Sequence, residues 1–150
     1  MQKLIKDGLL LLTLCGLISC GGTKPEDLAV ANAKLKPCPS SPNCVSTHAD
    51  RTDQEHYISP IRYKESRQQA KEKLMAVIDE MPRTKLHANQ DDYIHVTFTT
   101  LVFRFVDDVE FYLPNDARLI HFRSASRIGY ADLGKNRRRM KNVKEKFKAK

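Results

Sequence analysis

Residues 104–113 read RFVDDVEFYL, and after a turn-forming PNDA the chain continues with RLIHFRS at residues 118–124. In both segments apolar side chains alternate with polar or charged ones, which is typical of strands buried on one face. Val109, Phe111 and Leu113 share one face of the first strand, together with Asp107, while Asp108 is on the other. The sequence therefore predicts an antiparallel hairpin.

The register of this hairpin follows from keeping its apolar face intact. A four-residue loop pairs Phe111 with Ile120 and Val109 with Phe122, whereas a slip by one residue scatters the apolar side chains over both faces. This register also sets acidic residues opposite basic ones: Glu110 opposite His121, and Asp108 opposite Arg123.

The segments around the hairpin predict three more strands and two helices. Residues 66–81 carry apolar residues at helical spacing and end at Pro82, which cannot continue a helix. A second amphipathic helix begins near Asp132, and Gly129 permits the turn that leaves the sheet. Its apolar stripe is Leu133, Met140, Val143 and Phe147. The further strands are expected at residues 56–63, 84–88 and 93–100.

The resulting order is β-α-β-β-β-β-α. Hairpins dominate and no βαβ repeat occurs, so we expect an α+β fold. It is an antiparallel sheet of about five strands with two amphipathic helices on one face.

The N-terminus reads as a lipoprotein signal. Basic residues precede a short apolar run, and Leu17-Ile18-Ser19-Cys20-Gly21 has the pattern of a lipobox in which Cys20 is acylated. The run is too short to span about 30 Å of hydrocarbon. The sequence predicts a signal peptide at 1–19, a lipidated flexible tether at 20–36 and one α+β domain at 37–150. The alternative is an ordinary secretory signal in which Cys20 is incidental.

Either signal takes the mature chain out of the cytosol. Gly21, rather than an acidic residue, follows Cys20, which favours the periplasmic face of the outer membrane in a Gram-negative cell. In that oxidising compartment Cys38 and Cys44 are expected to form a disulfide. A metal site is the rival interpretation, with His48 and His56 as the nearby imidazoles.

Positive charge is concentrated at the C-terminus. Residues 135–150, from Lys135 to Lys150, hold nine Lys or Arg and one Glu, which equals the formal net charge of +8 of the whole chain. Such a run is often the solvated face of a terminal helix. It also fits contact with anionic lipid or lipopolysaccharide. A nucleic-acid partner is not expected for an exported lipoprotein.

Three motifs resemble one protein family. CPSSPNCVST at 38–47, FVDDVEF at 105–111 and RSASRIGYADLGKNRRRM at 123–140 resemble the domain-of-unknown-function family 1499 (DUF1499), found in bacterial lipoproteins and plant plastids. The resemblance covers residues 37–147 and implies no established activity. It gives these signature positions: Cys38, Cys44, Asp107, Asp108, Glu110, Arg123, Ser124, Ser126, Arg127, Gly129, Asp132, Gly134, Asn136 and Arg137.

The charged hairpin and the block that follows it are the candidate binding site. The acids and arginines there form either cross-strand ion pairs or a pocket for an anionic group. Asp132, suited to a helix N-cap, could instead lock the last helix to the sheet together with its polar neighbours. The candidate binding residues are Asp107, Asp108, Glu110, His121, Arg123, Ser126, Arg127, Asp132, Asn136 and Arg137.

A binding or envelope-assembly module for an anionic lipid, glycan or protein partner is the function we expect, with no cofactor. The alternative is a hydrolase using Ser126 or Ser124 with His121 and a hairpin acid. No nucleophile elbow is present, and His121 and Ser124 point to opposite faces of a strand. A metal role for the three hairpin acids competes with the neighbouring arginines for the same carboxylates.

Overall fold

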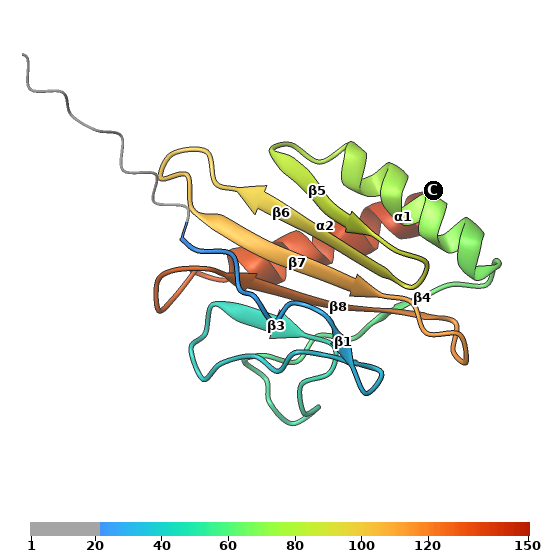
Figure 1. Cartoon of the computed structure of the whole chain (residues 1–150), viewed down its shortest axis with the longest axis horizontal. Helices are drawn as coiled ribbons and strands as arrows, with labels where there is room; N and C mark the ends of the chain where they lie inside the picture. The colour runs from blue at the N-terminus through green and yellow to red at the C-terminus, as the bar shows by residue number, and fades with distance from the viewer. Residues whose placement is uncertain (1–21) are drawn as a thin grey trace, which may run out of the picture.

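The predicted hairpin lies at the centre of a six-stranded antiparallel sheet (Figure 1). The computed structural model describes residues 22–150, so the predicted signal peptide and Cys20 lie outside the described residues. Five strands follow the order β3-β8-β7-β6-β5, and β4 pairs with the same edge of β8 as β3. Their bounds are β3 Cys44–Ser46, β4 Ile61–Arg62, β5 Thr84–Asn89, β6 Tyr93–Thr99, β7 Val106–Tyr112 and β8 Leu119–Ser126.

The expected register of the central hairpin is wrong by two residues. Phe111 pairs with Phe122 and Glu110 pairs with Arg123, because the loop between β7 and β8 spans residues 113–118 rather than four residues. A shift of two residues leaves every side chain on its predicted face, so the hydrophobic pattern could not distinguish the two registers.

Two helices cover one face of the sheet, as predicted. Helix α1 (Arg67–Asp79) begins at Ser66, which forms a capping box with Gln69. Helix α2 (Lys135–Ala149) buries Met140, Val143 and Phe147 of its predicted stripe. Leu133 was expected in that stripe, but it precedes the helix and 83 % of its surface is exposed.

The main core lies between the helices and the sheet. Alternate residues of the central strands point toward α1 and α2, and their large side chains are wholly buried. At about 25 cal/mol per Å² of apolar surface, this burial is the main source of stability. The core side chains that are wholly buried include Leu74, Val77, Ile94, Val96, Val109, Phe111, Leu113, Ile120, Phe122, Met140 and Val143.

The N-terminal segment crosses the opposite face of the sheet, where Figure 1 shows it in blue. It contains a two-stranded hairpin, β1 (Val30–Ala31) and β2 (Lys34–Leu35). Leu35 is buried against Tyr93 and Tyr112. The interpretation of residues 20–36 as a flexible tether is therefore wrong for the part that the structure describes. The N-terminal segment (residues 22–36) belongs to the folded domain.

The first predicted strand is too long. Within residues 56–63 only Ile61–Arg62 pairs as a strand, and the preceding chain makes an isolated bridge from Tyr57 to Ser46. Before it, β3 adds an edge strand that the sequence pattern does not predict, and from β4 onward the element order is the predicted one. None of the described helices is long and apolar enough to cross a membrane.

Candidate functional site

Asp108 forms a buried ionic cluster with Arg127 and His95, and not with Arg123, which was expected opposite it. Its carboxylate accepts hydrogen bonds from Arg127 Nε at 2.8 Å and Nη2 at 3.0 Å, and His95 Nε2 lies 2.8 Å from Oδ1. Burial raises the pKa of Asp108, but the bonds to His95 and Arg127 outweigh it and hold the pKa below its ordinary value. Asp108 is therefore an ionised, fully paired carboxylate.

Glu110 forms a second cluster on the same face of the sheet. The hydroxyl of Tyr93 donates to Glu110 Oε1 at 2.9 Å, and Arg123 Nη1 lies 3.5 Å from Oε2. Glu110 has no exposed surface, and burial raises its pKa. The Nε of Arg123 is buried without a hydrogen-bond partner, which makes this the weaker of the two clusters.

Asp107 points to the other face of the sheet, toward α2. Arg139 of α2 donates to its carboxylate and also stacks 4.8 Å from the centre of the Phe98 ring. Because both charged side chains are nearly buried, this ion pair connects α2 to the sheet. Arg139 was not among the predicted site residues.

Asn136 connects α2 to two strands. Its amide donates to the carbonyl of Asn43 at 3.0 Å and to Ser126 Oγ at 3.1 Å. Ser124, which is wholly buried, donates to its side-chain oxygen. The side-chain amide of Asn136 thus joins α2 to β8 and to the chain before β3.

Asp132 and Arg137 also hold α2 in place. The carboxylate of Asp132 accepts from the backbone N–H of Gly134 at 2.8 Å and of Asn136 at 2.6 Å. The residue at the N-cap position itself is Gly134, in a left-handed conformation. Arg137 donates to three backbone carbonyls, those of Gln54, Glu55 and Tyr57.

The candidate binding residues therefore do not form one pocket. They divide between the two faces of the sheet, and on one face Asp108 pairs with Arg127 and Glu110 with Arg123. The hydrolase geometry is also missing from the described residues. Both Ser124 and Ser126 bond to Asn136 on the helix face, while His121 lies on the opposite face and bonds to Thr47 at 3.1 Å. Neither serine has an imidazole base beside it.

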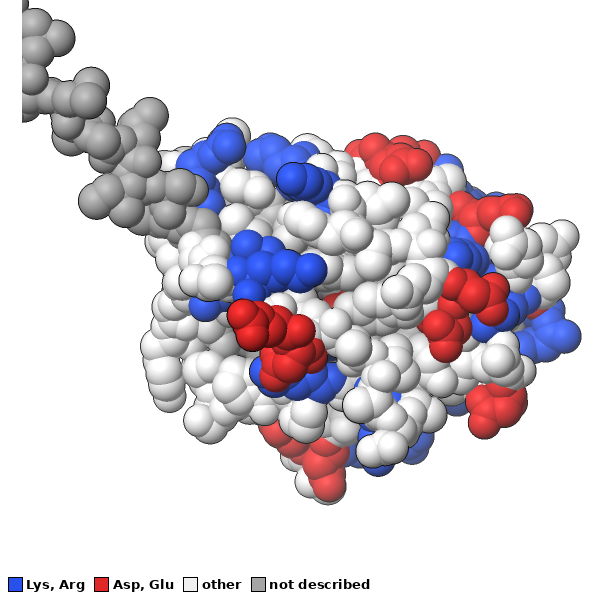
Figure 2. Space-filling model, in the orientation of Figure 1, with Lys and Arg blue, Asp and Glu red and all other residues white. Residues whose placement is uncertain are grey.

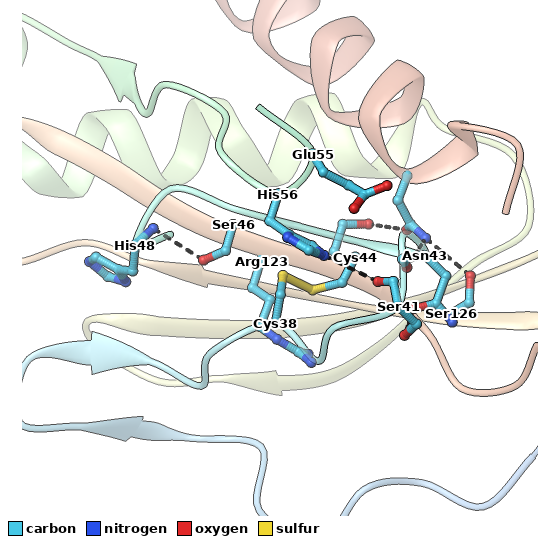
Figure 3. Close-up of a disulfide and its surroundings, with 12 residues drawn as sticks. Cys38, Ser41, Asn43, Cys44, Ser46, His48, Glu55, His56, Arg123 and Ser126 are labelled. Atoms are coloured by element: carbon cyan, nitrogen blue, oxygen red, sulfur yellow. Dashed lines mark hydrogen bonds between the residues drawn. A yellow bond between two sulfur atoms is a disulfide. The ribbon is translucent and has the colours of Figure 1, made fainter. Parts of the chain in front are cut away.

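Cys38 and Cys44 form the predicted disulfide, with their sulfur atoms 2.03 Å apart. Figure 3 shows His56 and Arg123 close to it. His56 is bonded to Asp53 at 2.7 Å and to the carbonyl of Ser41 at 3.2 Å, so it braces the loop that the disulfide closes. Among residues 22–150, no three His, Cys, Asp or Glu side chains come together as a metal site.

A basic pocket lies at the β4 edge of the sheet. It has a volume of about 580 Å³ and is lined by parts of the chain between Thr47 and Arg62, the start of β8, the C-terminal half of α2 and Lys34 of β2. None of the lining residues is acidic. Its cationic side chains are Lys34, Arg51, Arg62, Lys144 and Lys148.

Two stacked histidines form one wall of the basic pocket. The rings of His48 and His121 are 4.2 Å apart, and His48 Nδ1 accepts from the backbone N–H of Leu35 at 3.1 Å. Burial lowers the pKa of His48 to about 4, with a further contribution from His121. Burial also lowers the pKa of His121. At neutral pH both rings are uncharged, so the five Lys and Arg side chains supply the positive charge.

The fold and these contacts define an α+β domain with buried ion pairs on both faces of its sheet and a basic pocket at one edge. The family model described as "Protein of unknown function (DUF1499)" matches residues 34–147, and the chain belongs to this family. No curated protein matches the chain, and no solved structure matches it.

Several residues that build these clusters were missed because a single sequence gives them no signal. His95 and Tyr93 alternate with apolar residues in β6, so the pattern predicts the face on which they lie but not their partners. Lys34 comes from the expected tether, and Arg51 from a segment for which no helix or strand is predicted. The basic C-terminal run was the one usable signal, since it supplies Lys144 and Lys148 to the pocket.

Proposed function

We propose that this protein is an envelope lipoprotein, anchored through acylated Cys20, that binds an anionic ligand in the basic pocket. The lipobox supports the anchor, and Gly21 favours the periplasmic face of the outer membrane. The observation that carries the binding function is the composition of the basic pocket, which gathers five cationic side chains and no acid.

Like charges brought together without counter-ions repel one another, so a binding anion gains the attraction of all of them. Lys144 is held in this position by two hydrogen bonds of 2.7 Å from its ammonium group to Ser59. Burial, with the charge of Lys148, lowers the pKa of Lys144, which is the sign expected of a cation that lacks a neighbouring anion. A bound phosphate or carboxylate would reverse this effect.

The size and shape of the pocket indicate the class of ligand. Pockets of about 300–1,000 Å³ suit small molecules and headgroups rather than a folded protein surface. Arg51 and Arg62 add planar guanidinium groups, which match phosphate and carboxylate oxygens in pairs. The phosphorylated or carboxylated headgroup of a lipid or glycan is therefore the ligand class we propose.

Charge substitutions inside and outside the pocket test the binding function. Lys34→Gln/Lys148→Gln removes two charges from the pocket, and Lys85→Gln/Lys141→Gln removes two exposed charges elsewhere. Mass spectrometry of the detergent-solubilised protein should find a co-purified anionic species in the wild type and in the control pair, and lose it in the pocket pair. Equal retention by both pairs would reject the pocket.

Labelling with an alkyne fatty acid tests the anchor separately. The wild type should carry the label and sediment with membranes, and Cys20→Ser should lose both properties. A Cys20→Ser protein that still carries the label would show that another residue is acylated.

A further inference from the structure

Large apolar side chains are exposed at the end of the sheet where the N-terminal segment begins. The loop between β6 and β7 presents Leu101, Val102 and Phe103 with 64–75 % of their surface exposed. The loop between β8 and α2 adds Tyr130 at 75 % and Leu133 at 83 %. We call these residues, together with Ile128, the apolar end.

The two loops of the apolar end lie against each other. Residues of both, including Phe103, Ile128 and Leu133, line one pocket of about 230 Å³, and the backbone N–H of Arg127 donates to the carbonyl of Val106 at 3.0 Å. The apolar side chains therefore form one patch at a single end of the molecule. Contiguous exposed apolar surface of this kind marks an interaction site.

Two residues in the loops of the apolar end have a strained backbone conformation. Leu133 has φ = 55° and Arg104, beside Phe103, has φ = 56°, both in the left-handed region that side chains other than glycine avoid. Leu133 thus combines an unfavourable backbone conformation with an exposed apolar side chain, and nothing in the described part of the chain covers it. Such strain is typical of functional positions.

The proposed lipid anchor, Cys20, is close in the chain to a residue that lies at the apolar end. Gly22, the first described residue, lies so close to the apolar end that a Cβ placed on it would come within 2.8 Å of Ile128 Cγ2. Only two peptide links separate Gly22 from Cys20, a reach of at most about 7 Å. An acyl chain on Cys20 would therefore enter the bilayer next to Ile128.

Positive charge surrounds the apolar end. Arg104 lies within the first loop, and Arg83, Lys135 and Arg138 line a second pocket together with Leu101, Val102 and Phe103. Figure 2 shows basic side chains gathered at the end of the domain where the described chain begins. Exposed apolar residues and a tyrosine, bordered by lysine and arginine, are the composition of surfaces that bind the interface of an anionic bilayer.

We infer that the apolar end inserts into the interface of the membrane that carries the anchor and fixes the orientation of the domain on it. This inference uses the lipid anchor of the proposed function. The basic pocket lies at the other end of β8, about seven residues or roughly 23 Å away at 3.3 Å per residue. It therefore faces the aqueous side, and its ligand approaches from there rather than from the anchoring leaflet.

Single tryptophans can test the insertion, because the chain contains none. The full lipoprotein is reconstituted in phosphatidylcholine–phosphatidylglycerol vesicles as Phe103→Trp, Leu133→Trp or Asn115→Trp. Asn115 is exposed in the loop at the opposite end of β7 and serves as the control. With brominated lipid, the first two variants should lose fluorescence and emit at shorter wavelength, and the control should do neither.

The outcomes separate the insertion from the anchor. If all three variants float with the vesicles while Phe103→Trp and Leu133→Trp stay as unquenched as Asn115→Trp, the insertion is overturned and the anchor is intact. A blue shift without quenching by bromine means that a second copy of the chain covers the patch, and it also overturns the insertion. If the purified protein carries no acyl group but its tryptophans are still quenched, the insertion is supported and the proposed lipid anchor is rejected. The absence of both flotation and quenching overturns both.

Discussion

Arg123 Nη1 lies 3.5 Å from Glu110 Oε2, and both side chains are buried on the face of the sheet that the N-terminal segment crosses. Burial disfavours the charged form of the Glu110 carboxylate, and Arg123 is its counter-ion. Arg123→Ala would leave this carboxylate without a counter-ion in the interior. The free energy of unfolding should fall by about 3–5 kcal/mol, measured by urea denaturation.

Two further variants complete that experiment. Arg62→Ala removes an exposed arginine from β4 and should cost under about 1 kcal/mol. Glu110→Gln added to Arg123→Ala should recover part of the loss, because the amide oxygen can still accept from Tyr93 and carries no charge. A loss under about 1 kcal/mol for Arg123→Ala would show instead that Arg123 is free to bind a ligand.

The disulfide should stabilise the domain without being needed for folding. Cys38 and Cys44 are six residues apart, and in the chain-entropy model a loop of this size contributes about 2–3 kcal/mol. Cys38→Ser/Cys44→Ser should therefore lower the urea midpoint but leave a cooperative transition. Alkylation under denaturing conditions without reductant should detect no free thiol at these positions in the wild type, and two free thiols there would contradict the pairing.

The layers of this fold could be predicted because they depend on periodicity. Residues 66–81 and 104–124 repeat apolar side chains at helical and strand spacing, and the structure confirms a helix and a hairpin there. The register of the hairpin could not be predicted, since residues 113–118 accommodate either loop length. The strands β1 to β3 have two or three residues each, too few for any period to appear.

The site was predictable in chemistry but not in geometry. Acids and bases were correctly placed on adjacent strands, yet the sequence could not show that the partner of Asp108 is Arg127 rather than Arg123. It also could not show that Asp107 turns toward Arg139. Pairings of this kind depend on long-range packing, which brings α2 onto β8 and places Lys34 and Lys148 in the lining of one pocket.

Asp132 should stabilise the start of α2. Its carboxylate accepts from two backbone N–H groups that otherwise have no helical partner, and its charge interacts favourably with the helix N-terminus. Asp132→Ala should cost about 1–2 kcal/mol in a thermal or urea unfolding experiment. Asp132→Asn keeps an acceptor and should cost less.

Asp79 provides a control for that capping effect. It is exposed at the C-terminal end of α1, where a negative charge is unfavourable to the helix dipole. Asp79→Ala should therefore leave the stability unchanged or raise it slightly. If Asp79→Ala and Asp132→Ala destabilise the protein equally, the effect comes from net charge and not from capping.

His48 should make the stability depend on pH. Burial, and then the neighbouring His121, lower its pKa from 6.5 to about 4 in the folded protein. Between these two values the unfolded chain binds the proton and the folded chain does not, so folding is favoured above pH 6.5 and loses this contribution as the pH falls toward 4. His48→Gln should flatten this part of the curve of unfolding free energy against pH, because the amide oxygen still accepts from Leu35 but does not titrate.

His56 gives the control of opposite sign. Burial lowers its pKa, but the hydrogen bonds to Asp53 and Ser41 outweigh burial and raise the pKa above the ordinary value. Its contribution is therefore present at low pH and is lost as the pH rises, and His56→Gln should make the decline toward about pH 4 steeper. Urea midpoints of the wild type and both variants at about pH 7.5 and about pH 4.5 measure these differences, and the carboxylates that contact neither histidine cancel between them. An unchanged slope in His48→Gln would mean that burial does not lower the pKa of His48.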